Sequence, residues 1–267
     1  MGILNVTPDS FYPGSRTPVG AVDDIKRRAA ALLEQGADII DVGGYSTRPG
    51  AEVVSVQEEL RRIETGVGAV RELSSDIPVS IDTFRSEVAR EGVLNMSADI
   101  INDVSGGLLD DKMFDTVASL GVPYILMHMR GTPDSMTRLT DYPQGVVAGV
   151  AAELSGKLRE LSLRGVSDVI VDPGFGFAKT AGQNYELMAA LPGLERLLGR
   201  PMLVGVSRKS MIYKSLDITP AEALPGTTAL NVLALEGGAS ILRVHDVAEA
   251  VQAVKVWELF DKARVTF

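Results

Sequence analysis

Eight short runs of apolar, often β-branched residues alternate along the chain with longer amphipathic stretches, and this alternation constrains the fold more than any other feature. Short apolar runs of this kind predict buried strands, and the stretches between them have the periodicity of helices. The predicted strands are Gly2–Val6, Ile39–Val42, Pro78–Ile81, Ile100–Val104, Pro123–Met127, Val169–Val171, Met202–Val206 and Ala239–Val244. The predicted helices are roughly Val22–Gln35, Val56–Leu73, Arg85–Leu94, Asp111–Leu120, Gly145–Arg164, Tyr185–Leu198, Ala221–Glu236 and Val247–Phe260.

A chain of 267 residues, of which 45% are hydrophobic, can bury a sizeable core. Eight βα units without a break in composition favour a single (β/α)8 TIM barrel over residues 1–267. An open doubly wound sheet is the alternative, although no GxGxxG motif follows the first strand. We therefore expect an α/β fold with one barrel domain, whose N-terminal extension is short or absent.

The composition excludes several classes of function. A net charge of −9 and a pI near 4.9 argue against non-specific binding to nucleic acid or to an anionic membrane. The absence of cysteine excludes a thiol nucleophile, disulfides and cysteine-ligated zinc. No secretory signal opens the chain, and no apolar run reaches the roughly 18 residues that a membrane span requires. We expect a soluble cytoplasmic protein.

The sixth predicted strand ends at a carboxylate. Pro173 cannot continue a strand, and Gly174 and Gly176 favour a loop, so the strand must stop at Asp172. A glycine loop beside a buried carboxylate lets a ligand approach the backbone. Asp172 therefore either recognises a ligand or, more simply, caps the turn.

Polar residues stand at the ends of the other predicted strands as well. In a (β/α)8 barrel these ends converge on one rim, which is the face where active sites lie. The rim segments are Asn5–Phe11, Asp41–Gly50, Asp82–Thr83, Asn102–Asp103, His128–Pro133, Asp172, Ser207–Ser210 and Arg243–Asp246.

One group of rim residues suits an anion. Arg48, Arg208, Lys209, Arg243 and His245 are hydrogen-bond donors in an acidic protein, and the last four follow the seventh and eighth strands. Barrels frequently hold a phosphate there. A solvated basic turn is the alternative for Ser207–Ser210.

A second group suits a flat heterocycle. Asp82 follows the third strand, Asn102 lies in the fourth and Asp172 ends the sixth. A carboxylate accepts two parallel hydrogen bonds from an amino group and a ring N–H, and an amide both donates and accepts, so a 2-amino-4-oxo ring such as guanine or pterin fits. The alternative is that Asn102 ends a strand and Asp82 caps a helix.

Five motifs in this order resemble the dihydropteroate synthase family over nearly the whole chain. They are Leu4–Phe11, Ser46–Gly50, Asp172–Phe177, Ser207–Ser210 and Arg243–Asp246. The resemblance implies an enzyme of folate biosynthesis that is inhibited by sulfonamides, requires Mg²⁺ and forms a homodimer. It implies a transferase that joins 6-hydroxymethyl-7,8-dihydropterin diphosphate to 4-aminobenzoate, which gives 7,8-dihydropteroate and pyrophosphate.

The resemblance also implies roles for individual residues. Asp82, Asn102, Asp172 and Lys209 match the pterin contacts, and Arg48, Arg243 and His245 match the diphosphate site, with Asn5 as the metal ligand. The resemblance implies a diphosphate contact for Thr47 as well. The aminobenzoate pocket matches Phe11, Thr47, Pro49, Phe177 and Ser210. Asp82, Asp9 and Lys209 match the catalytic residues, of which Asp82 and Asp9 stabilise a cation at the pterin methylene in an SN1-like reaction.

Two other functions remain open. Pterin-dependent methyltransferases share the barrel and the pterin pocket but have no need for a diphosphate clamp, so Ser207–Ser210 and Arg243–His245 speak against them. A non-catalytic pterin-binding relative is the second alternative, which the intact Asn5, Asp9 and Arg48 disfavour.

Overall fold

The protein was analysed as a computed structural model that describes residues 1–7, 22–46 and 53–264. Its eight parallel strands are hydrogen-bonded in chain order. They are β1 (Gly2–Asn5), β2 (Ile40–Gly43), β3 (Val79–Asp82), β4 (Ile100–Asp103), β5 (Tyr124–Met127), β6 (Val169–Asp172), β7 (Met202–Val204) and β8 (Ala239–Leu242). The order of an open doubly wound sheet would reverse at a switch point, so this topology rules that alternative out.

The sheet closes on itself just beyond β8. Gly2 pairs in parallel with Val244, and the backbone N–H of Ile3 donates to the carbonyl of Val244 at 3.0 Å. The N–H of Val244 in turn donates to the carbonyl of Met1 at 3.0 Å. These contacts between the first strand and the segment after the last one confirm the predicted (β/α)8 barrel.

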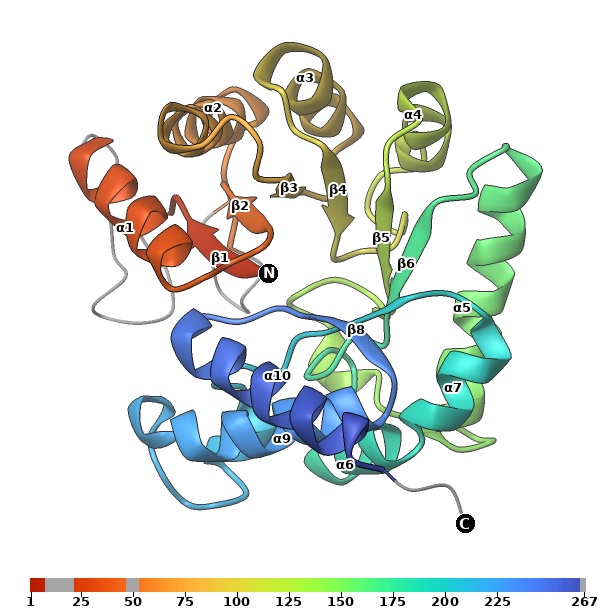
Figure 1. The fold of residues 1–267 in the computed structure, drawn as a ribbon. Helices are drawn as coiled ribbons and strands as arrows, with labels where there is room; N and C mark the ends of the chain where they lie inside the picture. The colour runs from red at the N-terminus through yellow and green to blue at the C-terminus, as the bar shows by residue number, and fades with distance from the viewer. Residues whose placement is uncertain (8–21, 47–52, 265–267) are drawn as a thin grey trace.

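Helices surround this barrel (Figure 1) because each crossover between parallel strands must cover the outside of the sheet. The longer ones are α1 (Val22–Glu34), α2 (Val56–Leu73), α3 (Ser86–Met96), α4 (Met113–Leu120), α5 (Val146–Leu163), α6 (Ala181–Ala189), α7 (Leu191–Leu198), α9 (Leu224–Glu236) and α10 (Val247–Lys262). Shorter segments are α8 (Ser210–Tyr213), η1 (Met136–Arg138) and η2 (Pro220–Glu222). In the part of the chain that the structure describes, no helix is long and apolar enough to cross a membrane.

The helix predicted at Tyr185–Leu198 was wrong in extent. A capping box formed by Thr180 and Gln183 starts α6 at Ala181, and α7 is a separate helix after Ala190. Pro192 lies in the first turn of α7, where its missing N–H costs nothing, but within one continuous helix it would break a backbone hydrogen bond.

The two faces of the strands carry different kinds of residue. Outward side chains such as Val42, Ile81 and Val204 join the main core beneath the helices. Inward side chains form a smaller cluster, which contains Ile100, Ile125, Leu203 and the partly buried Ile39, Ile170 and Ile241. Because strand side chains alternate, the inward positions at the carboxyl ends are Asn5, Gly43, Asp82, Asn102, Met127, Asp172, Gly205 and Arg243. The fold therefore places a polar layer on top of an apolar barrel interior.

Two glycines of α2 test the packing of the helix layer. A Cβ at Gly66 would lie 2.5 Å from Val42 and 2.9 Å from Val6, whereas a Cβ at the exposed Gly68 would meet nothing within 4 Å. We expect Gly66→Ala to lower the free energy of unfolding by about 1–3 kcal/mol through overpacking. Gly68→Ala should instead raise it by up to about 1 kcal/mol, because alanine favours a helix. Urea denaturation of both variants measures the difference, and equal effects would contradict this packing.

Candidate functional site

Five of the predicted site residues lie outside the described residues. They are Asp9, Phe11, Thr47, Arg48 and Pro49. The other nine, Asn5, Asp82, Asn102, Asp172, Phe177, Lys209, Ser210, Arg243 and His245, are described and belong to the carboxyl ends of strands or the loops that follow them.

Asp172 and Lys209 lie on the same side of the mouth. Asp172 is the last residue of β6, is 5% exposed and accepts a hydrogen bond from the N–H of Gly174 at 2.8 Å. Burial raises the pKa of Asp172, and the nearby Lys209 ammonium opposes that rise. The pKa of Lys209 is itself lowered to about 8 by burial, while the charge of Asp172 raises it. The two groups thus form a partly compensated pair of opposite charges.

Lys209 also contacts the loop that follows β6. Its Nζ donates to the carbonyl of Phe175 at 2.6 Å and lies 5.0 Å from the centre of the Phe177 ring. Ser210 follows directly and begins α8. The loops after β6 and β7 therefore bring a carboxylate, an ammonium group and an aromatic ring together.

Arg243 connects the two predicted groups of rim residues. Its Nη2 donates to Asp82 Oδ2 at 2.7 Å, and its Nε donates to Asp41 Oδ2 at 2.7 Å. Burial raises the pKa of Asp82 to about 7; Arg243 opposes this shift and the neighbouring Asp41 adds to it. Asn102 donates its Nδ2 to the same Asp41 oxygen at 3.1 Å, which leaves the Asn102 carbonyl oxygen as the acceptor it can offer a ring.

Two inward glycines make room for this arrangement. A Cβ at Gly43 would lie 3.2 Å from Asn5 Oδ1 and 3.9 Å from Asp82 Oδ2. A Cβ at Gly205 would lie 3.8 Å from the Cβ of Arg243 and 3.9 Å from Lys209 Nζ. Asn5 and Asp82 therefore border the space above Gly43, and Lys209 and Arg243 border the space above Gly205. Because Arg243 also binds Asp82, the acidic and cationic groups meet at one mouth.

His245 and Arg208 differ in their availability for an anion. Burial lowers the pKa of His245 to about 4, with Arg243 adding to the shift, so its imidazole is neutral at pH 7. Arg208, which the sequence also suggested for the anion site, is held elsewhere in the fold. Its Nε and Nη2 bind Asp246 at 2.8 and 2.9 Å, and its Nη1 binds the carbonyls of Pro220 and Ala221. The proposed contribution of Arg208 to anion binding is therefore not supported.

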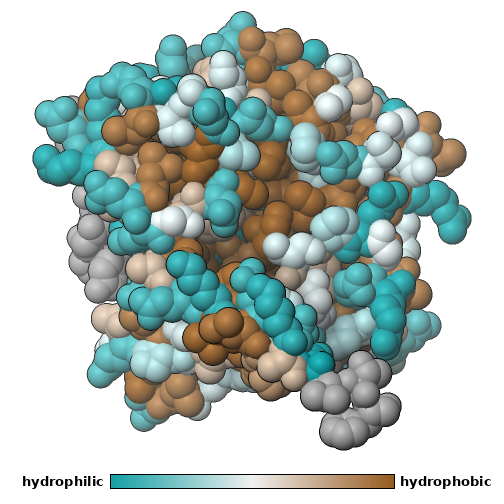
Figure 2. Space-filling model, in the orientation of Figure 1, coloured by the Kyte–Doolittle hydropathy of each residue, from teal (hydrophilic) through white to brown (hydrophobic). Residues whose placement is uncertain are grey.

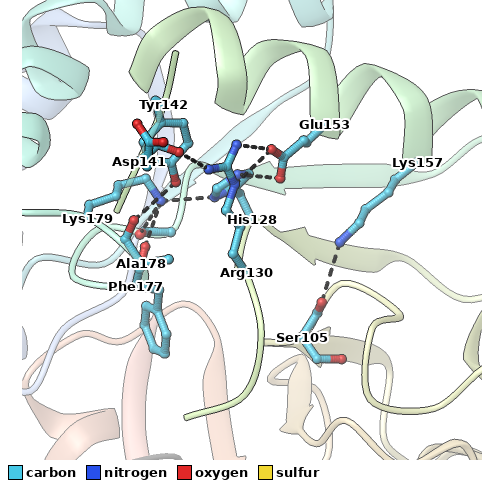
Figure 3. Close-up of polar contacts among 11 residues, drawn as sticks. Ser105, His128, Arg130, Asp141, Tyr142, Glu153, Lys157, Phe177, Ala178 and Lys179 are labelled. Atoms are coloured by element: carbon cyan, nitrogen blue, oxygen red, sulfur yellow. Dashed lines mark hydrogen bonds and ion pairs between the residues drawn. The ribbon is translucent and has the colours of Figure 1, made fainter. Parts of the chain in front are cut away.

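A second polar cluster supports the glycine loop after β6 (Figure 3). The Lys179 side chain lies inside this loop and donates to the carbonyls of Gly174 at 2.9 Å and Phe177 at 3.0 Å. Its third donor contacts His128 Nδ1 at 3.0 Å. Burial lowers the pKa of Lys179 to about 7, although the charge of Asp172 opposes this shift. One buried ammonium group therefore fixes the shape of the loop that carries Phe177.

His128 connects Lys179 to Glu153 of α5. The Glu153 carboxylate can only accept, so the ring proton of His128 is on Nε2, which lies 3.1 Å from Glu153 Oε2, and Nδ1 accepts from Lys179. Burial lowers the pKa of His128 to about 4, which agrees with a neutral ring. Arg130 binds the other oxygen of Glu153 through its Nε at 2.9 Å. In Figure 3 these side chains form a continuous chain from the β6 loop to α5.

Three residues of these clusters were not predicted from the sequence, namely Asp41, His128 and Lys179, although each lies in or beside a motif. Asp41 is fully buried in the middle of β2, and a charged residue inside an otherwise apolar strand was the signal that could have identified it. His128 and Lys179 are far apart in the sequence, so their contact could not be inferred from spacing.

The mouth offers one protein oxygen that suits Mg²⁺. Among the described residues, no group of three or more His, Cys, Asp or Glu side chains could hold a metal by itself. Mg²⁺ is usually held by one or two protein oxygens together with substrate phosphates and water. The carboxamide oxygen of Asn5, beside the space left by Gly43, is such an oxygen.

Glu153 allows a test of the cluster through pH. Hydrogen bonds from His128 and Arg130 lower the pKa of Glu153 to about 2, although burial opposes the shift. Because the folded pKa is depressed, the stabilisation is present above the ordinary pKa of about 4.3 and is lost as pH falls toward 2. We expect Glu153→Gln to lower the free energy of unfolding by about 1 kcal/mol at pH 7 and by less near pH 2.

Glu160→Gln is the matched control, because Glu160 belongs to the same helix and its ion pair with Arg164 is exposed. Its effect should stay below about 0.5 kcal/mol. Urea denaturation between pH 2 and pH 7 gives both values. A pH-independent loss in Glu153→Gln would contradict the proposed charge interaction.

Comparison with known proteins agrees with this geometry. The family described as pterin binding enzyme matches residues 1–245. A dihydropteroate synthase of Synechocystis is 45% identical, with 96% of this chain and 88% of the relative covered.

Solved structures give the same result. The dihydropteroate synthase of Yersinia pestis, solved with a sulfonamide drug, superposes with a TM-score of 0.90 at 37% identity and covers 98% of this chain and 93% of that one. The enzyme of Xanthomonas albilineans in complex with 7,8-dihydropteroate superposes with a TM-score of 0.84 at 36% identity, over 98% of this chain and 93% of that chain. This chain therefore belongs to the dihydropteroate synthase family of pterin-binding enzymes.

Proposed function

We propose that this protein is a dihydropteroate synthase, a transferase of folate biosynthesis. It joins 6-hydroxymethyl-7,8-dihydropterin diphosphate to 4-aminobenzoate and releases pyrophosphate. The observation that carries this proposal is the meeting of acidic and amide groups with Lys209 and Arg243 at one barrel mouth. The similarity to enzymes crystallised with 7,8-dihydropteroate and with a sulfonamide drug supports the same reaction and makes this protein a sulfonamide target.

The pterin ring binds between Asp172, Asn102, Asp82 and Lys209. A carboxylate accepts the paired N–H groups of a 2-amino-4-oxo ring, and Lys209 donates to its acceptor atoms. Asp172 is suited to this contact because Gly174 already occupies Oδ1 and holds the carboxylate in place. A bound ring also supplies donors to Asp82, which in the described residues contacts only a shared arginine nitrogen.

The diphosphate binds beside the ring, at Arg243, His245 and Arg48. Arg243 supplies positive charge, and the neutral His245 can donate one hydrogen bond from its ring. Asn5 would hold Mg²⁺ together with diphosphate oxygens. When bound, the ion offsets the negative charge of the leaving group.

The aminobenzoate binds next to the pterin methylene, against Phe177, Ser210, Phe11, Thr47 and Pro49. Lys179 and Lys209 both donate hydrogen bonds to carbonyls of the loop after β6, so the backbone that carries Phe177 is held in one conformation.

The reaction follows an SN1-like route. The bond between the methylene carbon and the diphosphate oxygen breaks first, and its electron pair leaves with pyrophosphate. Asp82 and Asp9 stabilise the resulting cation through their negative charge. The amine nitrogen of 4-aminobenzoate then forms the C–N bond and loses a proton. Exclusion of water from the mouth would prevent water from capturing the cation in place of the amine.

A pterin-dependent methyltransferase is the alternative enzyme. It would use the ring contacts but would have no need for Arg243 and His245 beside them. Both functions predict pterin binding, so a binding measurement alone does not distinguish them, whereas pyrophosphate release does.

Three further features remain proposals. We expect homodimers, whose interface would cover apolar side chains that α9 and α10 expose, namely Leu233, Val256, Leu259 and Phe260. Figure 2 shows apolar surface over α10. We also expect one domain over residues 1–267 and a cytoplasmic location.

Pyrophosphate release tests the proposed reaction. We expect purified protein to release pyrophosphate from the pterin diphosphate only when both 4-aminobenzoate and Mg²⁺ are present, and to form dihydropteroate in equal amount. Release that does not depend on 4-aminobenzoate would contradict the proposed function.

Removing either charged side chain of the ring site should weaken pterin binding. We expect Asp172→Ala and Lys209→Ala each to lower the affinity for 6-hydroxymethylpterin by more than about tenfold, since each leaves a buried partner unpaired. Asp168→Ala is the control, because Asp168 is exposed just before the other end of β6. Calorimetric titration measures all three variants, and near-native affinity in the first two would refute this pocket.

Pterin binding should also depend on the ionisation of Asp82. The pKa of Asp82 is raised to about 7, and an ionised carboxylate is a stronger hydrogen-bond acceptor than a carboxylic acid. We therefore expect the affinity for 6-hydroxymethylpterin to fall as pH drops below about 7, and binding near pH 6 to release a proton. Calorimetry in buffers of different ionisation enthalpy detects that proton. Asp82→Asn should abolish the release; if the variant releases as many protons as the wild type, another group is responsible.

A further inference from the structure

Asp41 stands where a charged residue is not expected. Its register neighbours are Ile3 in β1 and Ser80 in β3. The inward residues Ile100, Ile125 and Leu203 of other strands form the apolar cluster inside the barrel. Asp41 is therefore a fully buried carboxylate one inward position below the polar layer of the mouth. Burying a carboxylate costs free energy unless a partner compensates its charge. The contacts of Asp41 therefore indicate which role it has in the protein.

The contacts of Asp41 all lead to the mouth above it. Oδ2 accepts from Arg243 Nε at 2.7 Å, lies 2.6 Å from Arg243 Nη2, and accepts from Asn102 Nδ2 at 3.1 Å. Oδ1 has no hydrogen-bond partner among the described residues. A carboxylate that served the fold alone would be expected to use both oxygens. Asp41 instead directs one oxygen to Arg243 and Asn102.

This contact fixes the orientation of the Arg243 guanidinium. Nε is held by Asp41, and Nη2 is shared by Asp41 and Asp82 at 2.6 and 2.7 Å. Within the described ranges, Nη1 makes no hydrogen bond to protein. The guanidinium is planar, so fixing two of its nitrogens also fixes the third.

The two carboxylates differ in their accessibility. The side chain of Asp82 is 14% exposed at the mouth, whereas that of Asp41 is 0% exposed. A ligand at the mouth can therefore compete with Arg243 for Asp82 but cannot reach Asp41. When a pterin ring takes the oxygens of Asp82, Arg243 keeps its bonds to Asp41.

We propose that Asp41 is a positioning residue, which holds Arg243 so that Nη1 remains available to the leaving diphosphate while a pterin ring occupies Asp82. This inference rests on the proposed dihydropteroate synthase activity. Asp41 touches no substrate and acts only through Arg243 and Asn102. The orientation of Arg243 matters most where charge develops, which is on the leaving oxygen in the transition state.

Substitution kinetics test this role. We expect Asp41→Asn, which keeps the shape but removes the charge, to lower kcat about tenfold or more and to change KM for the pterin diphosphate less than threefold. Ser80→Ala is the matched control, since Ser80 lies beside Asp41, is buried and has no hydrogen-bond partner among the described residues. It should change kcat less than about twofold.

A double-mutant cycle separates positioning from general destabilisation. Arg243→Lys keeps the positive charge but has a single nitrogen, so it has no planar orientation for Asp41 to set. In that background we expect Asp41→Asn to lower kcat less than about twofold. The same tenfold loss in both backgrounds, or no loss in either, would overturn the proposal.

A measurement on the unmodified protein does not depend on whether Asp41→Asn folds. The Nε–H proton of Arg243 can be observed by NMR and assigned by its loss in Arg243→Lys. We expect it to exchange slowly with solvent, and to remain protected when 6-hydroxymethylpterin and pyrophosphate are added. Exchange as fast as that of an exposed arginine would overturn the inference. Absence of dihydropteroate formation by the wild type would refute the proposed function, whatever the exchange rate.

Discussion

The ion pair between Arg243 and the buried Asp41 is the interaction on which the arrangement of the mouth depends. Without it, the guanidinium of Arg243 and the partly buried carboxylate of Asp82 would simply neutralise each other. With this ion pair, Asp41 holds Arg243 from inside the barrel. Asp82 can then exchange its contact with Arg243 for a contact with a ligand at the mouth. A leaving group and a heterocycle can therefore bind side by side without requiring the protein to rearrange its charges.

The barrel makes this possible through the alternation of strand side chains. Positions two residues apart on a strand point to the same face, so the inward residue below each rim residue belongs to the barrel core. On most strands that lower residue is apolar, such as Ile100 beneath Asn102 or Ile170 beneath Asp172. On β2 the lower residue is Asp41 and the upper one is Gly43, which leaves the space in which Asn5 and Asp82 approach each other. The polar mouth therefore depends on β2, where a charged residue replaces an apolar one in the lower position and a glycine replaces a larger residue in the upper position.

Much of this site could be predicted from the sequence, and the remainder could not for physical reasons. The strand end at Asp172 was predictable because Pro173 and Gly174 prevent any continuation, and the structure ends β6 there. The pairing of Arg243 with Asp41 was not, because it joins residues 202 positions apart and depends on barrel closure. Arg208 was misjudged because a basic residue beside Lys209 looks like an anion ligand, whereas its side chain binds Asp246 and two backbone carbonyls.

A crystal structure of the protein with 6-hydroxymethylpterin and pyrophosphate bound together tests the central claim most directly, namely that a ring and its leaving group share one mouth. We expect the ring amino group and N–H on Asp172, its acceptor atoms near Lys209, and pyrophosphate within hydrogen-bonding distance of Arg243 Nη1 and His245. A ring bound away from Asp172, or pyrophosphate bound away from Arg243, would contradict that claim.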